Sequence, residues 1–300
     1  MTRNTLSNAN AAPSRMRPPT SLWRDALGRL RRHRIGMIGV LIVALLIFLA
    51  IFGPSLAPYD PNEINFDVRF APPSLQHPMG ADDFGRDILS RIMVGARVSL
   101  QVGIIAVTIA ALVGSFLGLV AGYSTRRLTD EVIMRSMDVL FAFPAILLAI
   151  AILAALGKGI ANAMIAIGIV YIPIFARIAR GSVLTMRERE FVDAAKAIGA
   201  GRNRILFRHI LPNSLSPLIV EISLSLAFAI LAEAALSFFG LGVQPPDPSW
   251  GRMLSEGRAY FRQSVWMGIW PGLAIMISVM GFNFLGDGLR DVLDPRLKNR

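Results

Sequence analysis

The side chains that could carry out catalysis or bind a metal are scattered along this 300-residue chain. Its three histidines, His33, His77 and His209, lie in three different segments, and there is no cysteine. General acid–base catalysis or zinc binding needs such residues grouped together. The phosphate-binding pattern GxxxxGK[ST] is absent as well. We therefore predict that the chain is not an enzyme, has no catalytic residue, binds no metal or other cofactor, and cannot hydrolyse ATP by itself.

One group of carboxylates does occur, in a glycine-rich segment that begins at Gly80. Asp82, Asp83 and Asp87 lie within a few residues of one another, as acidic residues do in calcium-binding loops. An EF-hand loop, however, needs acidic residues at its first, third and fifth positions and a late glutamate, and this spacing is absent here. We expect the segment to form a shaped loop outside the membrane rather than a metal site.

Two glutamates, Glu221 and Glu233, lie inside a long apolar stretch. Carboxylates within a membrane are costly and usually face protein or water. The two residues are 12 positions apart, about 120° around a helix, so they need not share one face. Glu221 would line a translocation path or form a helix contact. Glu233, nearer the outer surface, would shape an external gate or support helix packing, and the sequence leaves both pairs of alternatives open.

The elements that must position these side chains are membrane helices. Hydrophobic residues make up 54% of the chain and charged residues 17%, compared with roughly 25% charged in soluble proteins. About 20 apolar residues suffice for one helix to span a bilayer. The uncharged or nearly uncharged runs that meet this length are 35–59, 98–125, 139–176, 214–242 and 263–286.

The run at 139–176 is too long for one span and contains a single charge, Lys158. We predict a tight helical hairpin that turns at 157–159, with Pro144 and Pro173 bending its two helices. The hairpin supplies the third and fourth spans. The predicted fold class is therefore all-α, a polytopic membrane protein with six transmembrane helices.

The orientation of these helices follows from their basic flanks, because lysine and arginine gather on the cytoplasmic side. Segments 1–34, 123–138, 177–213 and the tail are rich in basic residues, and the alternate loops are poorer. Six spans with both termini cytoplasmic place every basic segment on one side. The net charge of +11 is then explained by membrane topology rather than by nucleic-acid binding.

The chain is expected to divide into parts that follow this topology. They are a cytoplasmic arm with an amphipathic segment (1–34), a first transmembrane helix (35–59), an external loop (60–97), a five-helix transmembrane core (98–290) with a cytoplasmic loop (177–213), and a cytoplasmic tail (291–300). In the arm, Trp23, Leu27 and Leu30 would share one face of a helix on the membrane surface. A solvated stretch is the alternative.

The most informative loop is EFVDAAKAIGAGRNRILFRHILPN, at 190–213. It predicts a short helix over 191–198, a break at 199–201, and a second helical stretch that stops at Pro212. Gly199 permits the positive φ at which a helix turns sharply. An amphipathic helix followed by a forced turn on the cytoplasmic face suits a mechanical contact with a soluble partner, and an ordinary loop is the alternative.

This loop resembles the EAA loop of permeases in binding-protein-dependent ABC importers, which has an EAA triplet, a glycine and an Ile-x-Leu-Pro ending. The coupling positions implied are Glu190, Asp193, Ala194, Ala195, Gly199, His209, Leu211 and Pro212. Asp193 and His209 depart from the family pattern, and Asp193 keeps the carboxylate. In that family the loop forms a coupling helix that docks on an ATPase subunit. The resemblance implies that residues 190–212 transmit ATP-driven motion to the membrane helices.

Further segments resemble the dipeptide, oligopeptide and nickel branch of these permeases. One is HPMGADDFGRD, whose signature positions are Gly80, Asp82, Gly85, Arg86 and Asp87. Others are LSFFGLGVQPP at 236–246, PSWG at 248–251 and GDGLRD at 286–291. The resemblance implies the type I importer permease fold and a place in a bacterial inner membrane, among its lipids.

The same resemblance implies partners and a substrate class. The partners are a second homologous permease, two ATPase subunits that hold ATP and Mg, and an extracytoplasmic substrate-binding protein. Dipeptides or oligopeptides would be the substrates, and glutathione and nickel chelates are alternatives that this chain does not separate. A stand-alone transporter driven by a gradient would instead need paired ionisable residues near the middle of the membrane. Glu221 has no evident basic partner for such a pair.

Overall fold

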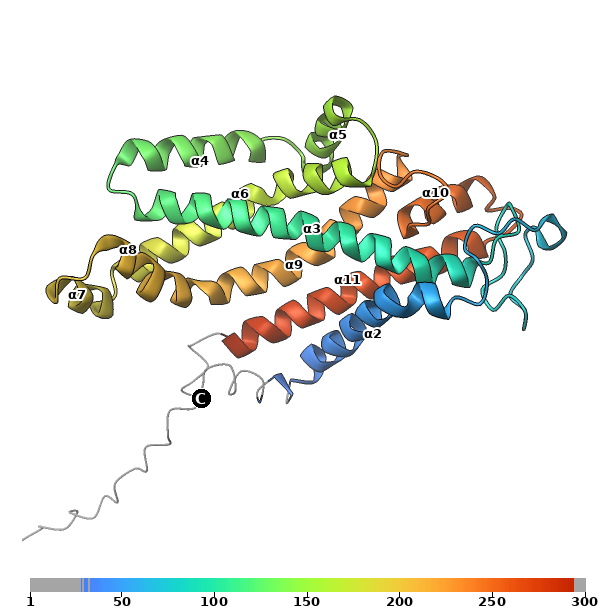
Figure 1. Cartoon of the computed structure of the whole chain (residues 1–300), viewed down its shortest axis with the longest axis horizontal. Helices are drawn as coiled ribbons and strands as arrows, with labels where there is room; N and C mark the ends of the chain where they lie inside the picture. The colour runs from blue at the N-terminus through green and yellow to red at the C-terminus, as the bar shows by residue number, and fades with distance from the viewer. Residues whose placement is uncertain (1–27, 29, 32, 294–300) are drawn as a thin grey trace, which may run out of the picture.

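The chain folds into an elongated bundle of helices, shown by a computed structural model that describes residues 28, 30–31 and 33–293 (Figure 1). In this part of the chain the only extended pairing is an isolated bridge between Ala81 and Asp87. The predicted all-α class is therefore confirmed. The surface helix predicted around Trp23 and Leu27, like the last seven residues of the tail, lies outside the described residues.

Among the described residues, five long helices are apolar enough to cross a membrane. They are α2 (Arg34–Leu56), α3 (Ile88–Tyr123), α6 (Ile160–Arg187), α9 (Leu211–Phe238) and α11 (Trp266–Leu293). Two shorter helices, α4 (Arg127–Phe141) and α5 (Ala145–Leu156), are long and apolar enough only as a pair, and they count as a sixth, bent pass if the pair is taken as one span. Nε2 of His33, at the start of α2, lies 3.1 Å from Asp291 of α11, so the first and last passes begin and end side by side.

The third pass differs from the hairpin predicted over 139–176. Helix α4 begins well before this run, and Pro144 then starts α5 at an angle of 94° to it. Pro144 separates two helices instead of bending one, because a proline disfavours helical backbone at the residue before it. The predicted turn is present, with φ of +92° at Gly157 and +130° at Gly159. Helix α6 continues past the expected end at Ala176.

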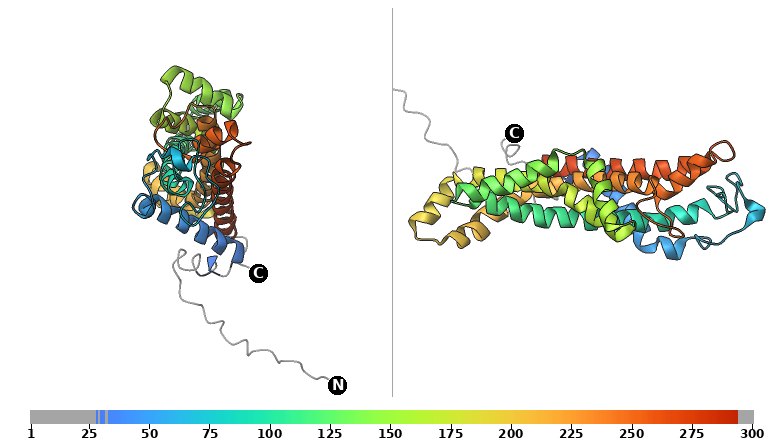
Figure 2. Two further views of the ribbon diagram at one scale, coloured as in Figure 1. Left: turned by 90° about the vertical axis from the view of Figure 1, so that its right-hand side faces the viewer. Right: turned by 90° about the horizontal axis from the view of Figure 1, so that it is seen from above.

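The two ends of the bundle carry different structures (Figures 1 and 2). One, here called the α7 end, holds the short helices α7 and α8. The other, the α10 end, holds the segment 57–87, with the 3₁₀ turn η1 (Phe66–Val68), and helix α10 (Trp250–Ala259). The external loop predicted at 60–97 is shorter, because α3 begins at Ile88. At 36 residues, α3 is about 54 Å long and exceeds the roughly 30 Å hydrocarbon core, so it extends beyond the membrane.

The packing of α3 against α6 is the most extensive helix contact in the described part of the bundle. A Cβ built at Gly114 of α3 would lie 2.5 Å from the Ile172 carbonyl oxygen, and one at Gly118 would overlap the Ala176 carbonyl oxygen. Small residues at this spacing let two helix backbones approach closely. Helices α3 and α6 therefore form the rigid centre to which the functional segments are attached.

Candidate functional site

The loop between α6 and α9 contains a short helix, α7 (Glu190–Ala197), that ends in a Schellman turn. The Gly199 N–H donates to the Lys196 carbonyl (2.9 Å), and the Ala200 N–H donates to the Ala195 carbonyl (3.0 Å). These two bonds define the motif. Gly199 has φ of +79°, a conformation that glycine adopts without steric cost. The predicted helix and the break after it are both present.

Helix α7 has one buried and one exposed face. Val192 is fully buried, Ala195 nearly so, and both belong to a buried apolar cluster that also contains Leu119 of α3 and Val183 of α6. On the other side Phe191 is 40% exposed and Ile198, which follows α7, is 86% exposed. The matched residues Glu190, Asp193 and Ala194 are also exposed. The helix is thus anchored in the bundle and presents apolar and acidic side chains outward.

A continuous helical rod leads from this loop along the bundle. It consists of α8 (Arg202–Ile205), the π-helical turn η2 (Leu206–Ile210) and α9. The prediction that Pro212 stops the helix is wrong, because Pro212 lies in the first turn of α9 and the helix continues to Phe238. The wider π turn before Pro212 makes room for the proline ring, which would otherwise meet the carbonyl oxygen four residues earlier in the chain. His209 and Leu211 are half-buried in this rod.

Two arginines that the sequence does not single out tie the loop to the end of α3. Arg187 Nη1 donates to the Gly122 carbonyl (2.9 Å), and Arg202 Nη2 donates to the Tyr123 carbonyl (3.0 Å). The Tyr123 hydroxyl donates back to the Arg202 carbonyl (3.0 Å). Cations also interact favourably with the dipole at a helix C-terminus. The only signal for these arginines in the sequence is a basic loop, which membrane topology already explains.

At the α10 end, the predicted signature residues come together in the turn before α3. Asp87 caps α3 by accepting from the Ser90 N–H (2.8 Å) and hydroxyl (2.7 Å). Its other oxygen lies 2.9 Å from His77 Nδ1. Gly80 and Gly85 have φ of +84° and +74°, and a Cβ at Gly85 would collide with the backbone of the preceding loop. The signature therefore specifies the shape of this turn.

Arg86 lies among three carboxylates, Asp82, Asp83 and Glu256, which are close enough together to share a cation. Its Nε is 2.6 Å from Asp82 Oδ2, and its Nη2 is 3.3 Å from Glu256 Oε2. The buried Arg91 approaches the same two oxygens at 3.6 Å. These contacts make the arrangement an ion-pair network that joins the turn to α10.

Asp83 is the least well paired member of this network. Its Oδ1 has no hydrogen-bond partner and lies 3.5 Å from Arg86 Nη2. Burial, and then the neighbouring Asp82 carboxylate, raises the pKa of Asp83 above its ordinary value. Because the pKa is higher in the folded state, the protonated form stabilises the turn, and this contribution is lost as the pH rises through the folded-state pKa.

Glu233 is completely enclosed where α3, α9 and the start of α10 meet. The hydroxyls of Ser237 and Ser99 donate to its two carboxylate oxygens at 2.7 and 3.2 Å. Of the two roles left open by the sequence, this geometry matches a helix contact, because the carboxylate joins α9 to α3 and has no exposed surface.

Replacing Glu233 by leucine is expected to destabilise the bundle by about 1–3 kcal/mol, because buried hydroxyls would lose their acceptor. The Tm of the purified protein in mild detergent measures this. Glu221→Leu is the matched control, since Glu221 is partly exposed and its one hydroxyl partner is Ser225. A Tm that falls as much in Glu221→Leu as in Glu233→Leu would contradict the packing role of Glu233.

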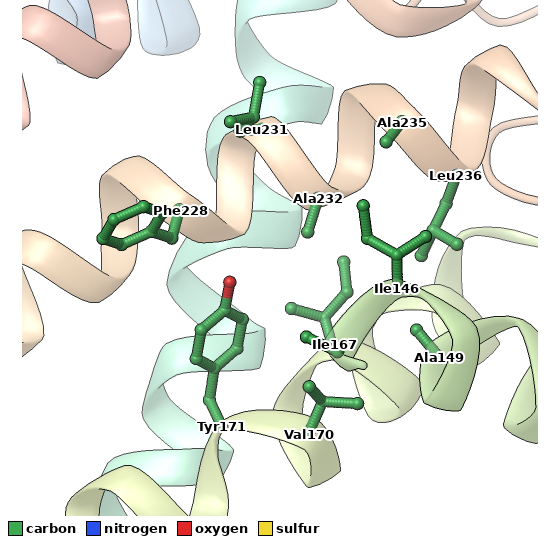
Figure 3. Close-up of a pocket in the computed structure, with 11 residues that line it drawn as sticks. Ile146, Ala149, Ile167, Val170, Tyr171, Phe228, Leu231, Ala232, Ala235 and Leu236 are labelled. Carbon is green, nitrogen blue, oxygen red and sulfur yellow. The ribbon is translucent and has the colours of Figure 1, made fainter. Parts of the chain in front are cut away.

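Glu221 lies about three turns nearer the α7 end of α9 than Glu233. The Ser225 hydroxyl donates to its Oε1 at 3.0 Å. Beyond Tyr171 a recess of about 230 Å³ lies between α5, α6 and α9 (Figure 3). Apart from the Tyr171 hydroxyl, apolar side chains line this recess.

Comparison with known proteins identifies the family. Residues 114–299 match the family described as the inner membrane component of binding-protein-dependent transport systems. This chain belongs to that permease family. Residues 21–73 also match the N-terminal transmembrane domain of oligopeptide transport permease C. The permease is therefore an integral protein of the inner membrane, as its sequence predicts, and its family is a membrane component rather than an enzyme.

Curated relatives resemble the permease over nearly its whole length. It is 50% identical over 279 residues to the dipeptide transport system permease protein DppC of Alkalihalophilus pseudofirmus, covering 93% of this chain and 91% of the relative. A putative peptide transport system permease protein of Brucella abortus is 47% identical over 270 residues, 90% of each chain. The glutathione transport system permease protein GsiD of Escherichia coli is 48% identical over 287 residues, 95% of this chain and 93% of GsiD.

The fold of the permease is also found in a solved structure. A chain from the inward-facing MetNI methionine ABC transporter aligns with a TM-score of 0.57 at 17% sequence identity. The alignment covers 68% of this permease and 96% of that chain. The predicted fold of an ABC importer permease is therefore confirmed.

Proposed function

We propose that this permease is one of two homologous membrane subunits that form the translocation pathway of an ATP-driven importer of short peptides. The observation that carries the proposal is the exposed face of α7, with Phe191 and Ile198 at the tip of the bundle. Exposed apolar side chains at such a place mark a protein interface. In the proposal α7 lies in the cytoplasm and docks on one of two ATPase subunits, which bind ATP and Mg.

The packing around α7 suggests how ATP-driven closure of the ATPase subunits reaches the membrane. Val192 and Ala195 anchor α7 on the central helices, and Arg187 and Arg202 hold the end of α3. The rod formed by α8, η2 and α9 continues from the same loop. A displacement of α7 therefore moves α3, α6 and α9 together. Alternating access then arises from rigid-body motion of this subunit against its partner permease.

The substrate is proposed to be a dipeptide or oligopeptide delivered by an extracytoplasmic binding protein at the α10 end. The names of the relatives from Alkalihalophilus pseudofirmus and Brucella abortus favour this class. Glutathione is a second candidate because GsiD is nearly as similar as the dipeptide permease. Glutathione is itself a small peptide, so both substrates suit the same type of pathway, and the binding protein would select between them.

Affinity purification of the permease from its native membrane in mild detergent tests the proposal. Mass spectrometry is expected to find two ATPase subunits and a homologous permease, and Ile198→Asp should lose the ATPases because a charge replaces the exposed apolar contact. Leu75→Asp is the matched control, since Leu75 is equally exposed but lies at the α10 end. Recovery of the wild-type chain alone, as a stable homo-oligomer, would contradict the proposal. The recovered binding protein can be titrated with peptides and glutathione to identify the substrate.

A further inference from the structure

The recess between α5, α6 and α9 exists because of the broken third pass. Helix α5 turns by 94° from α4, and its first turns line the recess with Ala145, Ile146 and Ala149. Alanines at 149, 232 and 235 leave the space open, while Tyr171 and Phe228 stand together at the end nearer α7 (Figure 3). The volume of about 230 Å³ is enough for one large apolar side chain.

A carboxylate lies on the same face of α9 as this recess. At 3.6 residues per turn, positions 221, 225, 228 and 232 fall within about 60° of one another. Glu221 thus lies about two turns before Phe228, the first residue of α9 that lines the recess. In the described part of the chain it forms no salt bridge, and its hydrogen-bond partner is Ser225. Its charge is available to a cation from outside this chain.

This face of the bundle is not suited to lipid. An ionisable side chain inside a membrane faces protein or a water-filled path rather than hydrocarbon. The exposed side chains of α2 provide the contrast, because those between Ile35 and Phe52 are all apolar. Glu221 and the Tyr171 hydroxyl therefore indicate that the face of α6 and α9 lines the transport route.

We propose that the recess and Glu221 form a transit site for the N-terminal residue of a peptide. The apolar side chain of this residue enters the recess, and its α-ammonium group pairs with the Glu221 carboxylate. The aromatic rings of Tyr171 and Phe228 lie between these two positions and add a favourable surface for the cation. A lipid acyl chain would fill the recess equally well but leave the carboxylate unpaired. This inference rests on the proposed function of peptide import.

Uptake by the complete importer, reconstituted in proteoliposomes with its own binding protein, tests the site. The measured quantity is the ratio of leucyl-alanine to alanyl-alanine uptake, relative to the same ratio in wild type, so that selection by the binding protein cancels. Ala232→Phe fills the recess and is expected to lower this ratio at least about tenfold, the usual size of discrimination in an apolar pocket. Phe228→Ala enlarges the recess and should raise the ratio.

Two further variants complete the test. Glu221→Gln should lower the uptake of both peptides about tenfold without changing their ratio, because both have an α-ammonium group, and Glu221→Asp should restore part of it. Ala44→Phe is the matched control, since Ala44 is exposed on α2, and its ratio should equal that of wild type.

The outcomes separate this inference from the function on which it rests. If Ala232→Phe and Phe228→Ala change both uptakes by the same factor, the recess holds lipid or nothing, and the transit site is wrong while peptide import stands. If Glu221→Gln transports both peptides normally, the proposed ammonium contact is wrong. If the wild-type complex takes up neither peptide, the proposed function itself fails.

Discussion

Replacing Gly199 by valine is expected to abolish peptide uptake while leaving the permease folded and inserted in the membrane. Gly199 holds φ of +79°, and an L-residue with a side chain costs about 1–2 kcal/mol in that conformation. Space is not the cause, because a Cβ at Gly199 would meet no atom within 4 Å. Unwinding the Schellman turn relieves the strain and redirects Ile198. Uptake of a labelled dipeptide into proteoliposomes should fall by at least about tenfold.

Gly201 offers a matched control two residues away. It has φ of −66° and extended backbone, and a Cβ there would also meet no atom within 4 Å. A valine at Gly201 is therefore expected to leave uptake close to that of wild type. Gly199→Asn should fall between the two, because asparagine tolerates positive φ better than valine. Normal transport by Gly199→Val would show that the direction of α7 does not matter for coupling.

The backbone of α7 and of the break that follows it could be predicted, because the sequence features that specify them lie within a few residues of one another. An apolar periodicity over a few residues predicts a short helix, and the glycine that follows predicts its left-handed end. The same local reasoning failed at Pro212. A proline in a sequence looks like a stop, but here a π turn comes directly before the first turn of α9 and the helix continues past Pro212. The π turn that lets the rod run through this point has no signature of its own in the sequence.

Helix α4 could not be predicted from uncharged runs in the sequence, because it is amphipathic and charged. Its acidic residues look like loop residues until their partners are known. Arg180 of α6 binds Asp130 through two bonds of 2.6 Å, and Arg177 binds Asp138 at 2.7 Å. Each pair joins residues far apart in the sequence, so neither periodicity nor composition reveals it. These ion pairs therefore hold α4 to α6 in addition to an apolar cluster that contains Met137 of α4 and Ile172 of α6.

The two intramembrane glutamates show the same limit. Their presence in an apolar stretch marked both as unusual, but the sequence could not distinguish their roles. Ser99, which binds Glu233, is 134 positions away, and the recess beside Glu221 is formed by three helices. Which carboxylate is enclosed and which is available depends on contacts that only the assembled bundle provides.

Replacing Gly118 by leucine is expected to prevent normal packing of α3 against α6. A Cβ at this position already overlaps the Ala176 carbonyl oxygen and lies 2.7 Å from the Ala179 Cβ. The helices cannot separate locally, because Gly114, one turn away, is packed just as closely. The cost should exceed the roughly 1–3 kcal/mol of ordinary overpacking. Size-exclusion chromatography in detergent should show a much lower yield of folded permease, with a lower Tm for what remains.

Gly272→Leu is the control for this substitution. Gly272 lies within a membrane-crossing helix, α11, but a Cβ there would meet no atom within 4 Å, so its yield and Tm should match those of wild type. Gly118→Ala separates the two possible causes of damage. If close backbone approach is the cause, alanine should also lower the Tm, because its Cβ alone makes the overlap. The opposite result would be a wild-type Tm for Gly118→Ala and the same Tm for Gly118→Leu and Gly272→Leu. It would show that α3 and α6 can move apart, and the proposed coupling through a rigid centre would then be wrong.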